Sequence, residues 1–272
     1  MKLPILKPTE SVTPADLVRL AQHAEEQYFR TLGDPASLDF GLAILSDEFP
    51  ALPEANQVRD ITLPPGLDPE EALRQVEATF ATRKQTCRQW YFAGGVAPPA
   101  LVEALTLRGC KTHAGHLWVL EHARDLGSRT DLMVIPARAA LPRLADLAEA
   151  AEAQGGHHDP HVLVQYREAA VRHLDDIIVD GLLAFENTEP VGTLNLVLAG
   201  EIGLVMDFYV RPDKLGRRIG STLLERAGEL AARSRLARLC LFCDDNNVPA
   251  KALYAKAGFV EVAAVSRMTQ GA

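Results

Sequence analysis

The stretch from Val210 to Leu224, VRPDKLGRRIGSTLL, combines glycines and basic residues in a pattern that suits a bound phosphate group. It follows the apolar run Ile202 to Val210, which is typical of a strand, and a helix is expected to begin near Arg217. The first N–H groups of a helix have no internal partner and lie at its positive end, so they can hold a pyrophosphate. Gly216 and Gly220 allow close approach of the backbone. Four basic side chains add positive charge: Arg211, Lys214, Arg217 and Arg218. The alternative is an ordinary turn with a solvated basic face.

A second motif, NNVPAKALYAKAGF, runs from Asn246 to Phe259 after the strand-like segment Leu239 to Phe242. Asp245 to Asn247 supply N-cap residues, and Pro249 lies in the first turn, where its missing N–H costs nothing. A short helix is therefore expected, ended by Gly258. One face of this helix carries Ala250, Leu253, Tyr254 and Ala257.

The patterns V-x-P…G-x-x-x-G…L-L and N-x-x-A-x-x-L-Y-x-x-x-G-F resemble the GNAT superfamily of acyl-CoA-dependent N-acetyltransferases over roughly the last half of the chain. The resemblance implies that acetyl-CoA is a co-substrate, that the first motif binds its pyrophosphate, and that Tyr254 lies near the thioester sulfur. The cofactor-binding residues that it implies are Phe208, Tyr209, Val210, Leu215, Gly216, Arg217, Arg218, Ile219, Gly220, Ser221, Asn247 and Ala250.

The first motif departs from the family pattern of Gln or Arg, two residues, Gly, one residue, and Gly or Ala. Leu215 occupies the place of the Gln or Arg, and Arg218 that of the first glycine, whereas Gly220 keeps its place. An arginine there could crowd the phosphates or contribute its charge, so the departure bears on cofactor affinity.

The resemblance implies direct attack of a neutral primary amine, from a small molecule or a peptide, on the thioester carbonyl. The amine needs a base, and Asp207, just before the phosphate turn, is the nearest carboxylate. A backbone N–H of Phe208 to Val210 can meet the oxyanion beside a bulge, and Tyr254 can protonate the leaving thiolate. Alternatively, Asp207 makes local hydrogen bonds only and Tyr254 is a core aromatic.

A competing class is a non-catalytic module that binds acyl-CoA, or nothing, and acts in sensing or interaction. Leu215 and Arg218 favour this reading, whereas Tyr254 and the basic turn favour the enzyme. The sequence does not separate amine acceptors from one another or from a hydroxyl.

From Asp131 onward, the expected elements form an α+β fold with a mixed, mainly antiparallel central sheet flanked by helices. Three successive strands before the glycine turn argue against a Rossmann unit. The expected strands are Leu132 to Pro136, Ile177 to Glu186, Val191 to Leu198 and Ile202 to Val210, with helices over Pro142 to Ala153 and His161 to Leu174. We predict two domains, residues 1–130 and 131–272.

The first half is predicted to be an α+β domain as well. Its expected helices are Thr13 to Thr31, Pro69 to Thr82 and Ala97 to Leu107, and its expected strands are Phe40 to Leu45, Gln89 to Phe92 and Gly115 to Leu120. Pro99, Leu105 and Gly109 parallel Pro249, Tyr254 and Gly258, with one residue of slip near the proline. The parallel indicates either a degenerate, non-catalytic acetyltransferase-like unit or a chance similarity of a helix followed by a strand.

Composition limits the possible partners. The chain has 272 residues, a net charge of −8 and a pI near 5.5, which argues against nucleic-acid binding. The N-terminal sequence lacks the apolar core of a signal peptide, and no apolar run is long enough to span a membrane, so we expect a cytoplasmic protein without a membrane partner. A monomer or a homodimer is expected.

Cysteine and histidine spacing suggests no metal site. Cys240 and Cys243 are expected to pack in the core, because residues three apart in a strand face opposite sides. His113 and His116 are expected in a solvated loop. The cluster from His157 to His161 falls between two expected helices, where the resemblance implies the border of the acceptor pocket; capping and solvation are the alternative.

Overall fold

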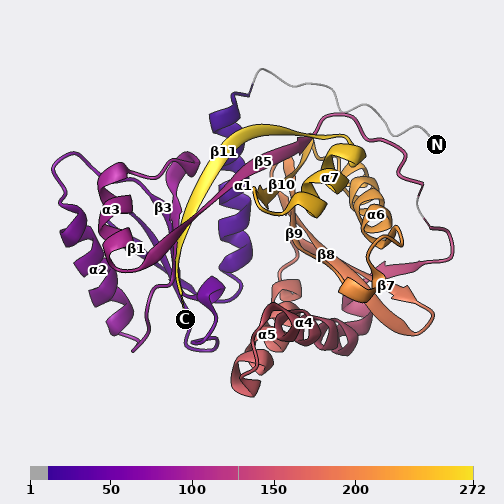
Figure 1. The fold of residues 1–272 in the computed structure, drawn as a ribbon, viewed down its shortest axis with the longest axis horizontal. Coiled ribbons are helices and arrows are strands. Elements are labelled where there is room, and N and C mark those ends of the chain that lie inside the picture. Colours follow the sequence, from indigo (N-terminus) through magenta and orange to yellow (C-terminus); the bar gives the residue numbers. More distant parts are fainter. Residues whose placement is uncertain (1–11, 128, 272) are drawn as a thin grey trace.

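The computed structural model describes residues 12–127 and 129–271, which form one 11-stranded sheet flanked by helices (Figure 1). Residues 1–11, for which the sequence predicts no signal peptide, lie outside the described part. The helices are α1 (Pro14–Phe29), α2 (Pro69–Ala81), α3 (Pro99–Leu107), α4 (Leu141–Gly155), α5 (Pro160–Arg172), α6 (Ile219–Arg233) and α7 (Val248–Ala257). The strands are β1 (Asp34–Leu38), β2 (Gly41–Leu45), β3 (Gln57–Ile61), β4 (Gln89–Phe92), β5 (Cys110–Leu120), β6 (Met133–Pro136), β7 (Val179–Glu186), β8 (Glu189–Ala199), β9 (Ile202–Val210), β10 (Arg238–Asp244) and β11 (Phe259–Gln270).

Helix boundaries follow the capping residues. Thr13 and Asp16 form a capping box at the start of α1, with the Asp16 N–H 3.2 Å from Thr13 Oγ1. Asn247 caps α7, and Gly258 ends it in the left-handed conformation at φ 98°. The predicted α+β class and mainly antiparallel sheet are confirmed.

The two halves of the chain repeat one order of elements. In the first half β1, β2 and β3 are antiparallel neighbours, α2 crosses to β4 parallel to β3, and α3 and β5 follow. In the second half β7, β8 and β9 are antiparallel, α6 crosses to β10 parallel to β9, and α7 and β11 follow. The predicted parallel between Pro99–Gly109 and Pro249–Gly258 is therefore confirmed, because α3 and α7 occupy corresponding places.

The last strands of the two halves are exchanged. β5 lies between β10 and β11, and β11 lies between β5 and β4, so each last strand pairs with the other half as well as with its counterpart. Figure 1 shows β5 and β11 running side by side from one half to the other. Strands from both sides of residue 130 belong to the same sheet. The division into two domains at residue 130 stays a prediction.

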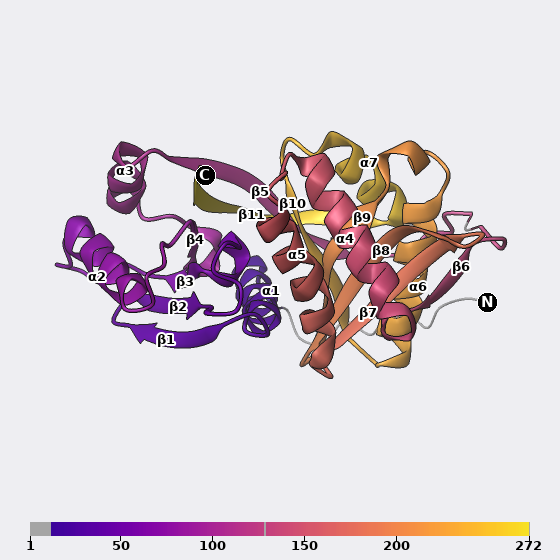
Figure 2. The same cartoon turned by 90° about the horizontal axis from the view of Figure 1, so that it is seen from below.

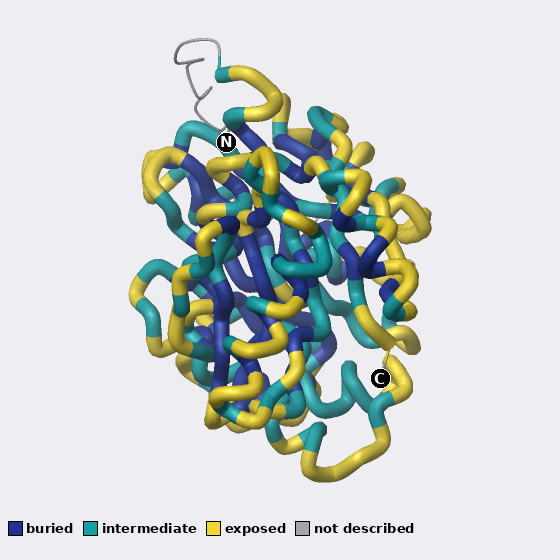
Figure 3. The backbone as a smooth tube through the Cα atoms, turned by 90° about the vertical axis from the view of Figure 1, so that its left-hand side faces the viewer, coloured by how far each residue is buried: buried dark blue, intermediate teal, exposed yellow. Residues whose placement is uncertain are grey.

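Successive side chains along the central strands pack into different hydrophobic clusters. Leu183, Val197 and Leu204 pack with α1, α4 and α5, whereas the adjacent residues Leu182, Leu196 and Val205 pack with α6 and α7. A third cluster lies under α2 and α3. Figure 2 shows α4 and α5 in front of β7, β8 and β9, and Figure 3 shows the buried residues concentrated in the interior of the molecule. Cys240 and Cys243 belong to opposite cores, as predicted.

Three sequence-based expectations were incomplete or wrong. β1 and β3 were not predicted, because β1 is largely exposed and begins with Asp34-Pro35, and β3 buries the polar residues Gln57 and Arg59. His113 and His116 lie in β5 and not in a loop, because β11 pairs with β5 along its whole length.

The described residues lack two kinds of feature. None of their helices is long and apolar enough to cross a membrane. They contain no group of three or more histidine, cysteine or acidic residues arranged to hold a metal ion.

Candidate functional site

A β-bulge in β9 determines the direction of Asp207. Asn195 of β8 lies opposite Met206, and Thr193 lies opposite Tyr209, so Asp207 and Phe208 together face one residue. Asp207 has φ 44°, a left-handed conformation that non-glycine residues rarely adopt. The bulge shifts the alternation of side chains, and Asp207 faces the same side as Met206 and Tyr209, toward α1, α4 and α5.

β9 and β10 separate beyond the bulge. Their parallel pairing runs from Ile202 opposite Arg238 to Val205 opposite Leu241, and both strands continue past the last pair. Phe208 to Val210, which the resemblance assigns to the thioester and the cofactor, lie in this diverging part of β9. Their backbone groups on the β10 side are therefore available to a ligand between the two strands.

The loop after β9 presents backbone N–H groups. A short 3₁₀ turn, Pro212–Lys214, leads through Leu215 and Gly216 to α6, whose first intrahelical hydrogen bond joins the Thr222 N–H to the Arg218 carbonyl at 3.0 Å. Within the described chain, the N–H groups of residues 216–221 donate to no protein atom outside helix α6. Ile219 and Ser221 are buried, so only their backbone could reach an anion. The arrangement suits a pyrophosphate.

The basic side chains of the loop contact a carboxylate. Lys214 Nζ lies 2.8 Å and Arg217 Nη1 3.4 Å from Glu186 Oε2, and Arg129 bonds the other oxygen at 2.8 Å. These donors, with Lys214 first, lower the pKa of Glu186 to about 2. Glu186 therefore holds two loop cations together at the end of β7.

The two residues that depart from the family pattern, Arg218 and Leu215, differ in their surroundings. Arg218 has φ 60°, which explains why glycine suits this place, and its guanidinium lies 3.3 Å from the Gly127 carbonyl oxygen. Leu215 is exposed. Gly220 permits close packing, because a Cβ there would lie 3.1 Å from Leu253 and 3.3 Å from Phe208.

Tyr254 lies on the buried face of α7, as predicted, with 7% of its surface exposed. Its ring centroid is 6.2 Å from those of Phe208 and Trp118 and 6.0 Å from that of Phe259. Burial raises its pKa, so the phenol keeps its proton at neutral pH. Asn247 accepts the Ala250 N–H at 3.3 Å, a helix cap, and Ala250 packs against the same core.

A cavity of about 240 Å³ opens beside the bulge, between α1, α4, α5 and the strands β8 and β9. Phe208 lies between this cavity and Tyr254, since it lines the cavity and also contacts the tyrosine ring. Asp207 and Tyr209 line the cavity too, so the structure brings these three predicted residues to one wall. Most other lining residues are leucine, alanine or aromatic.

The cavity carries three carboxylates: Glu54, Glu152 and Asp207. Among the described residues no lysine or arginine lines it. Burial lowers the pKa of the lining histidine His173 to about 4, so its ring is neutral at pH 7. Burial, with Glu54 and Asp207 nearby, raises the pKa of Glu152 to about 7, and burial likewise raises that of Glu54. The cavity is therefore acidic, and no lysine or arginine on its described wall pairs with its carboxyl groups.

Sequence reasoning located Asp207 but missed Glu54, Glu152 and His173. These residues come from a 3₁₀ turn (Pro53–Ala55), from α4 and from a 3₁₀ turn after α5 (His173–Asp175), and no local motif marks them. In the histidine cluster that the sequence singled out, His157 Nε2 lies 3.8 Å from Glu152 Oε2, and the His157 ring centroid lies 5.4 Å from that of Tyr166. Glu152 and Tyr166 both line the cavity. Asp159 caps α5 by accepting the His161 N–H.

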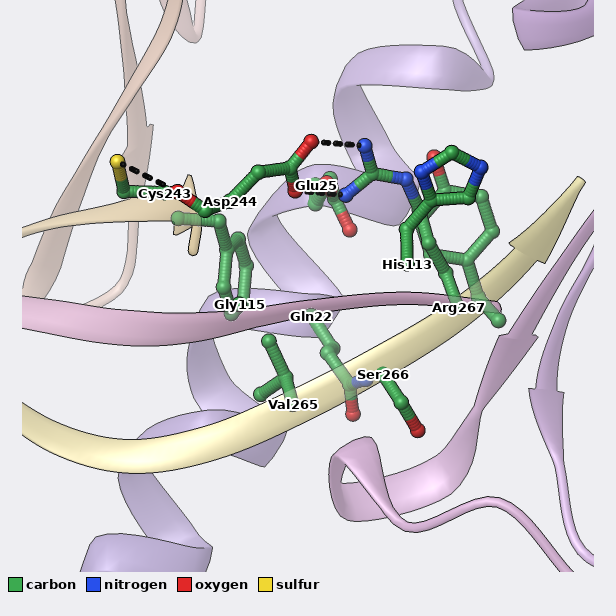
Figure 4. A pocket seen from close by; sticks show the side chains of 11 residues that line it. Gln22, Glu25, His113, Gly115, Cys243, Asp244, Val265, Ser266 and Arg267 are labelled. Carbon is green, nitrogen blue, oxygen red and sulfur yellow. Dashed lines mark hydrogen bonds and ion pairs between the residues drawn. The ribbon is translucent and has the colours of Figure 1, made fainter. Parts of the chain in front are cut away.

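Another, small cavity of about 30 Å³ lies between α1, β5, β10 and β11 (Figure 4). Its charges are paired internally: Arg267 makes two bonds of 2.6 and 2.7 Å with Asp244, and Glu25 pairs with the buried Arg59. His113 on its wall lies 2.8 Å from Thr269. This cavity offers little uncompensated charge to a ligand.

Comparisons with known proteins agree with the geometry of the second half. Residues 143–259 match the family model described as Acetyltransferase (GNAT) family. A GCN5-related N-acetyltransferase from Kribbella flavida aligns over 96% of this chain and 98% of its own, with TM-score 0.63 and 16% identity. A functionally unknown conserved protein from Staphylococcus epidermidis shares the fold over 88% of this chain and 94% of its own, with TM-score 0.61 and 17% identity. A Drosophila protein shares it over 98% of each chain, with TM-score 0.57 and 12% identity. No curated protein sequence matches the chain.

Proposed function

Since residues 143–259 match the model of the GNAT acetyltransferase family, we propose that this protein transfers the acetyl group of acetyl-CoA to a primary amine in a ternary complex. The observation that carries the proposal is the acidic cavity beside the bulge of β9, next to the uncovered N–H groups that precede and begin α6. One feature suits an amine and the other suits the pyrophosphate of the cofactor.

The cofactor would lie between the diverging ends of β9 and β10. The N–H groups of Gly216 to Ser221 would hold the pyrophosphate, with Lys214 and Arg217 close by. The backbone of Phe208 to Val210 would donate to the oxyanion. Tyr254, protonated at neutral pH, would return a proton to the leaving thiolate.

The acceptor would enter through the acidic cavity. Glu54 and Glu152 attract an ammonium group, which favours an amine with additional positive charge over a hydroxyl or an anionic acceptor. Asp207 adjoins the part of β9 that would face the thioester, so it would take the proton of the attacking amine, directly or through water. The C–N bond forms as the C–S bond breaks, and coenzyme A leaves with its thiol protonated.

Cofactor binding is tested by isothermal titration with acetyl-CoA and with desulfo-CoA. We expect micromolar affinity that weakens by about 1–3 kcal/mol in Arg217→Ala, because a charge-assisted contact is lost. Arg226→Ala is the matched control, since Arg226 is an exposed arginine of α6 that pairs with Glu229 away from the loop. Absence of binding at millimolar acetyl-CoA would move the conclusion to a non-catalytic interaction module.

The acceptor class is tested by thiol release with three four-carbon amines that differ in charge. We expect turnover to fall in the order 1,4-diaminobutane, butylamine, 4-aminobutanoate, because the cavity carboxylates attract the dication and repel the carboxylate. Equal rates for all three amines would contradict the role of the acidic cavity.

A further inference from the structure

Tyr28 of α1, in the first half of the chain, reaches the site of the second half. Its side chain is fully buried, and its ring stacks on that of His173 with centroids 3.7 Å apart and planes at 10°. Thr31, one turn later, donates to the Tyr28 carbonyl and lies 2.7 Å from His173 Nδ1. The position of the Tyr28 ring is therefore defined by packing on both halves.

The Tyr28 hydroxyl lies between two side chains of the bulge region. Burial, with the nearby Asp207 charge, raises the pKa of Tyr28 well above 10, so the hydroxyl keeps its proton and donates. It donates to Asp207 Oδ2 at 2.5 Å, and Asn195 Nδ2 donates to the Tyr28 oxygen at 2.7 Å and lies 3.5 Å from Asp207 Oδ2. Both donors to Asp207 bond the same oxygen, Oδ2, and in the described chain Oδ1 accepts no hydrogen bond.

This arrangement constrains an otherwise mobile group. Asp207 is exposed and sits on a bulge residue of positive φ, so its carboxylate would sample several rotamers without a partner. The bonds to Oδ2 restrain the carboxylate on the wall of the cavity that Asp207 lines and leave Oδ1 without a hydrogen-bond partner in the described chain.

We propose that the first half of the chain completes the catalytic site, with Tyr28 as a positioning residue that holds the Asp207 carboxylate toward the acceptor amine. The inference rests on the proposed function. It assigns the first half a catalytic contribution, in place of the expected non-catalytic role, because Tyr28 bonds Asp207 across 179 residues of sequence and Asp207 lines the cavity.

The test compares Tyr28→Phe with Tyr91→Phe, using acetyl-CoA and 1,4-diaminobutane. Phenylalanine keeps the ring that stacks on His173 and removes only the hydroxyl. Tyr91 is a matched control, because it is also a first-half tyrosine whose hydroxyl bonds a side chain, Gln89 at 3.1 Å, away from the acceptor cavity. We expect Tyr28→Phe to lower kcat by about tenfold or more, with an unchanged KM for acetyl-CoA and wild-type circular dichroism.

A double-mutant cycle with Asp207→Asn separates positioning from a general structural effect. If Tyr28 acts through Asp207, the Tyr28→Phe change lowers kcat in the wild type and has no further effect in Asp207→Asn. An equal loss in both backgrounds, or wild-type kcat in Tyr28→Phe, overturns the inference and leaves the proposed function standing. A wild-type protein that acetylates none of the three amines overturns the proposed function and, with it, this role of Tyr28.

Discussion

Tyr254 is the residue whose chemistry is most sharply testable. Its ring is held by Phe208, Trp118 and Phe259, so Tyr254→Phe should keep the packing and remove only the hydroxyl. We expect a fall in kcat of about 10²-fold or more at unchanged acetyl-CoA affinity, because the leaving thiolate loses its proton donor. Single-turnover kinetics and titration with desulfo-CoA measure the two effects. A variant with wild-type kcat would show that Tyr254 only packs.

We expect Glu152 to make amine binding at the cavity depend on pH. Its pKa, raised to about 7 by burial and by Glu54 and Asp207, means that it gains negative charge as the pH rises from 6 to 8. The KM for 1,4-diaminobutane should fall over this range by about fivefold, corresponding to about 1 kcal/mol of added attraction. Glu152→Gln should flatten the profile, whereas an unchanged slope in this variant would contradict the assignment.

At the scale of elements, Glu186 at the end of β7 joins Lys214 and Arg217 of the loop before α6, and also Arg129. The pKa of Glu186 is depressed to about 2, so the folded state favours its ionised form. The resulting stabilisation is fully present above the unfolded value of about 4.3 and is lost as the pH falls toward 2.

Glu186→Gln should therefore have a lower melting temperature than the wild type at pH 7. The difference between the two proteins should stay constant down to about pH 5 and shrink between about pH 4 and 2. Thermal melting followed by circular dichroism measures it. Glu229→Gln, which removes an exposed helical pair with Arg226, is the control. A difference that grows on acidification would contradict the assignment.

Elements with strong local signals could be predicted from the sequence. β9 and β4 have the bounds that the sequence predicts, Ile202–Val210 and Gln89–Phe92, and α7 lies between its Asn247 cap and Gly258. β3 could not be recognised, because its polar Gln57 and Arg59 are buried through contacts with distant Glu25 and Tyr91. The acidic cavity was hidden for the same reason, since Glu54, Glu152 and Tyr28 converge only after folding.

At the scale of the whole molecule, the exchanged strands make each half depend on the other. The segment 131–272 alone would contain β11 without either of its neighbours, β4 and β5, and β10 without β5. A strand with both edges unpaired exposes a full row of backbone donors and acceptors.

Because each half depends on the other, the intact chain should unfold in a single cooperative transition, which coincident fluorescence and circular dichroism melts would detect.

The same dependence predicts how fragments behave. Fragment 131–272 should aggregate or give a poorly dispersed amide spectrum, whereas fragment 110–272, which adds β5, should fold, because β11, β5 and β10 can then pair in their native order. Expression of both fragments with matching tags, followed by amide NMR, provides the comparison. Fragment 110–272 should nevertheless remain a poor enzyme, because it lacks Tyr28 and Glu54. Independent folding of 131–272 would show that the exchange is dispensable and that residue 130 is a true domain boundary.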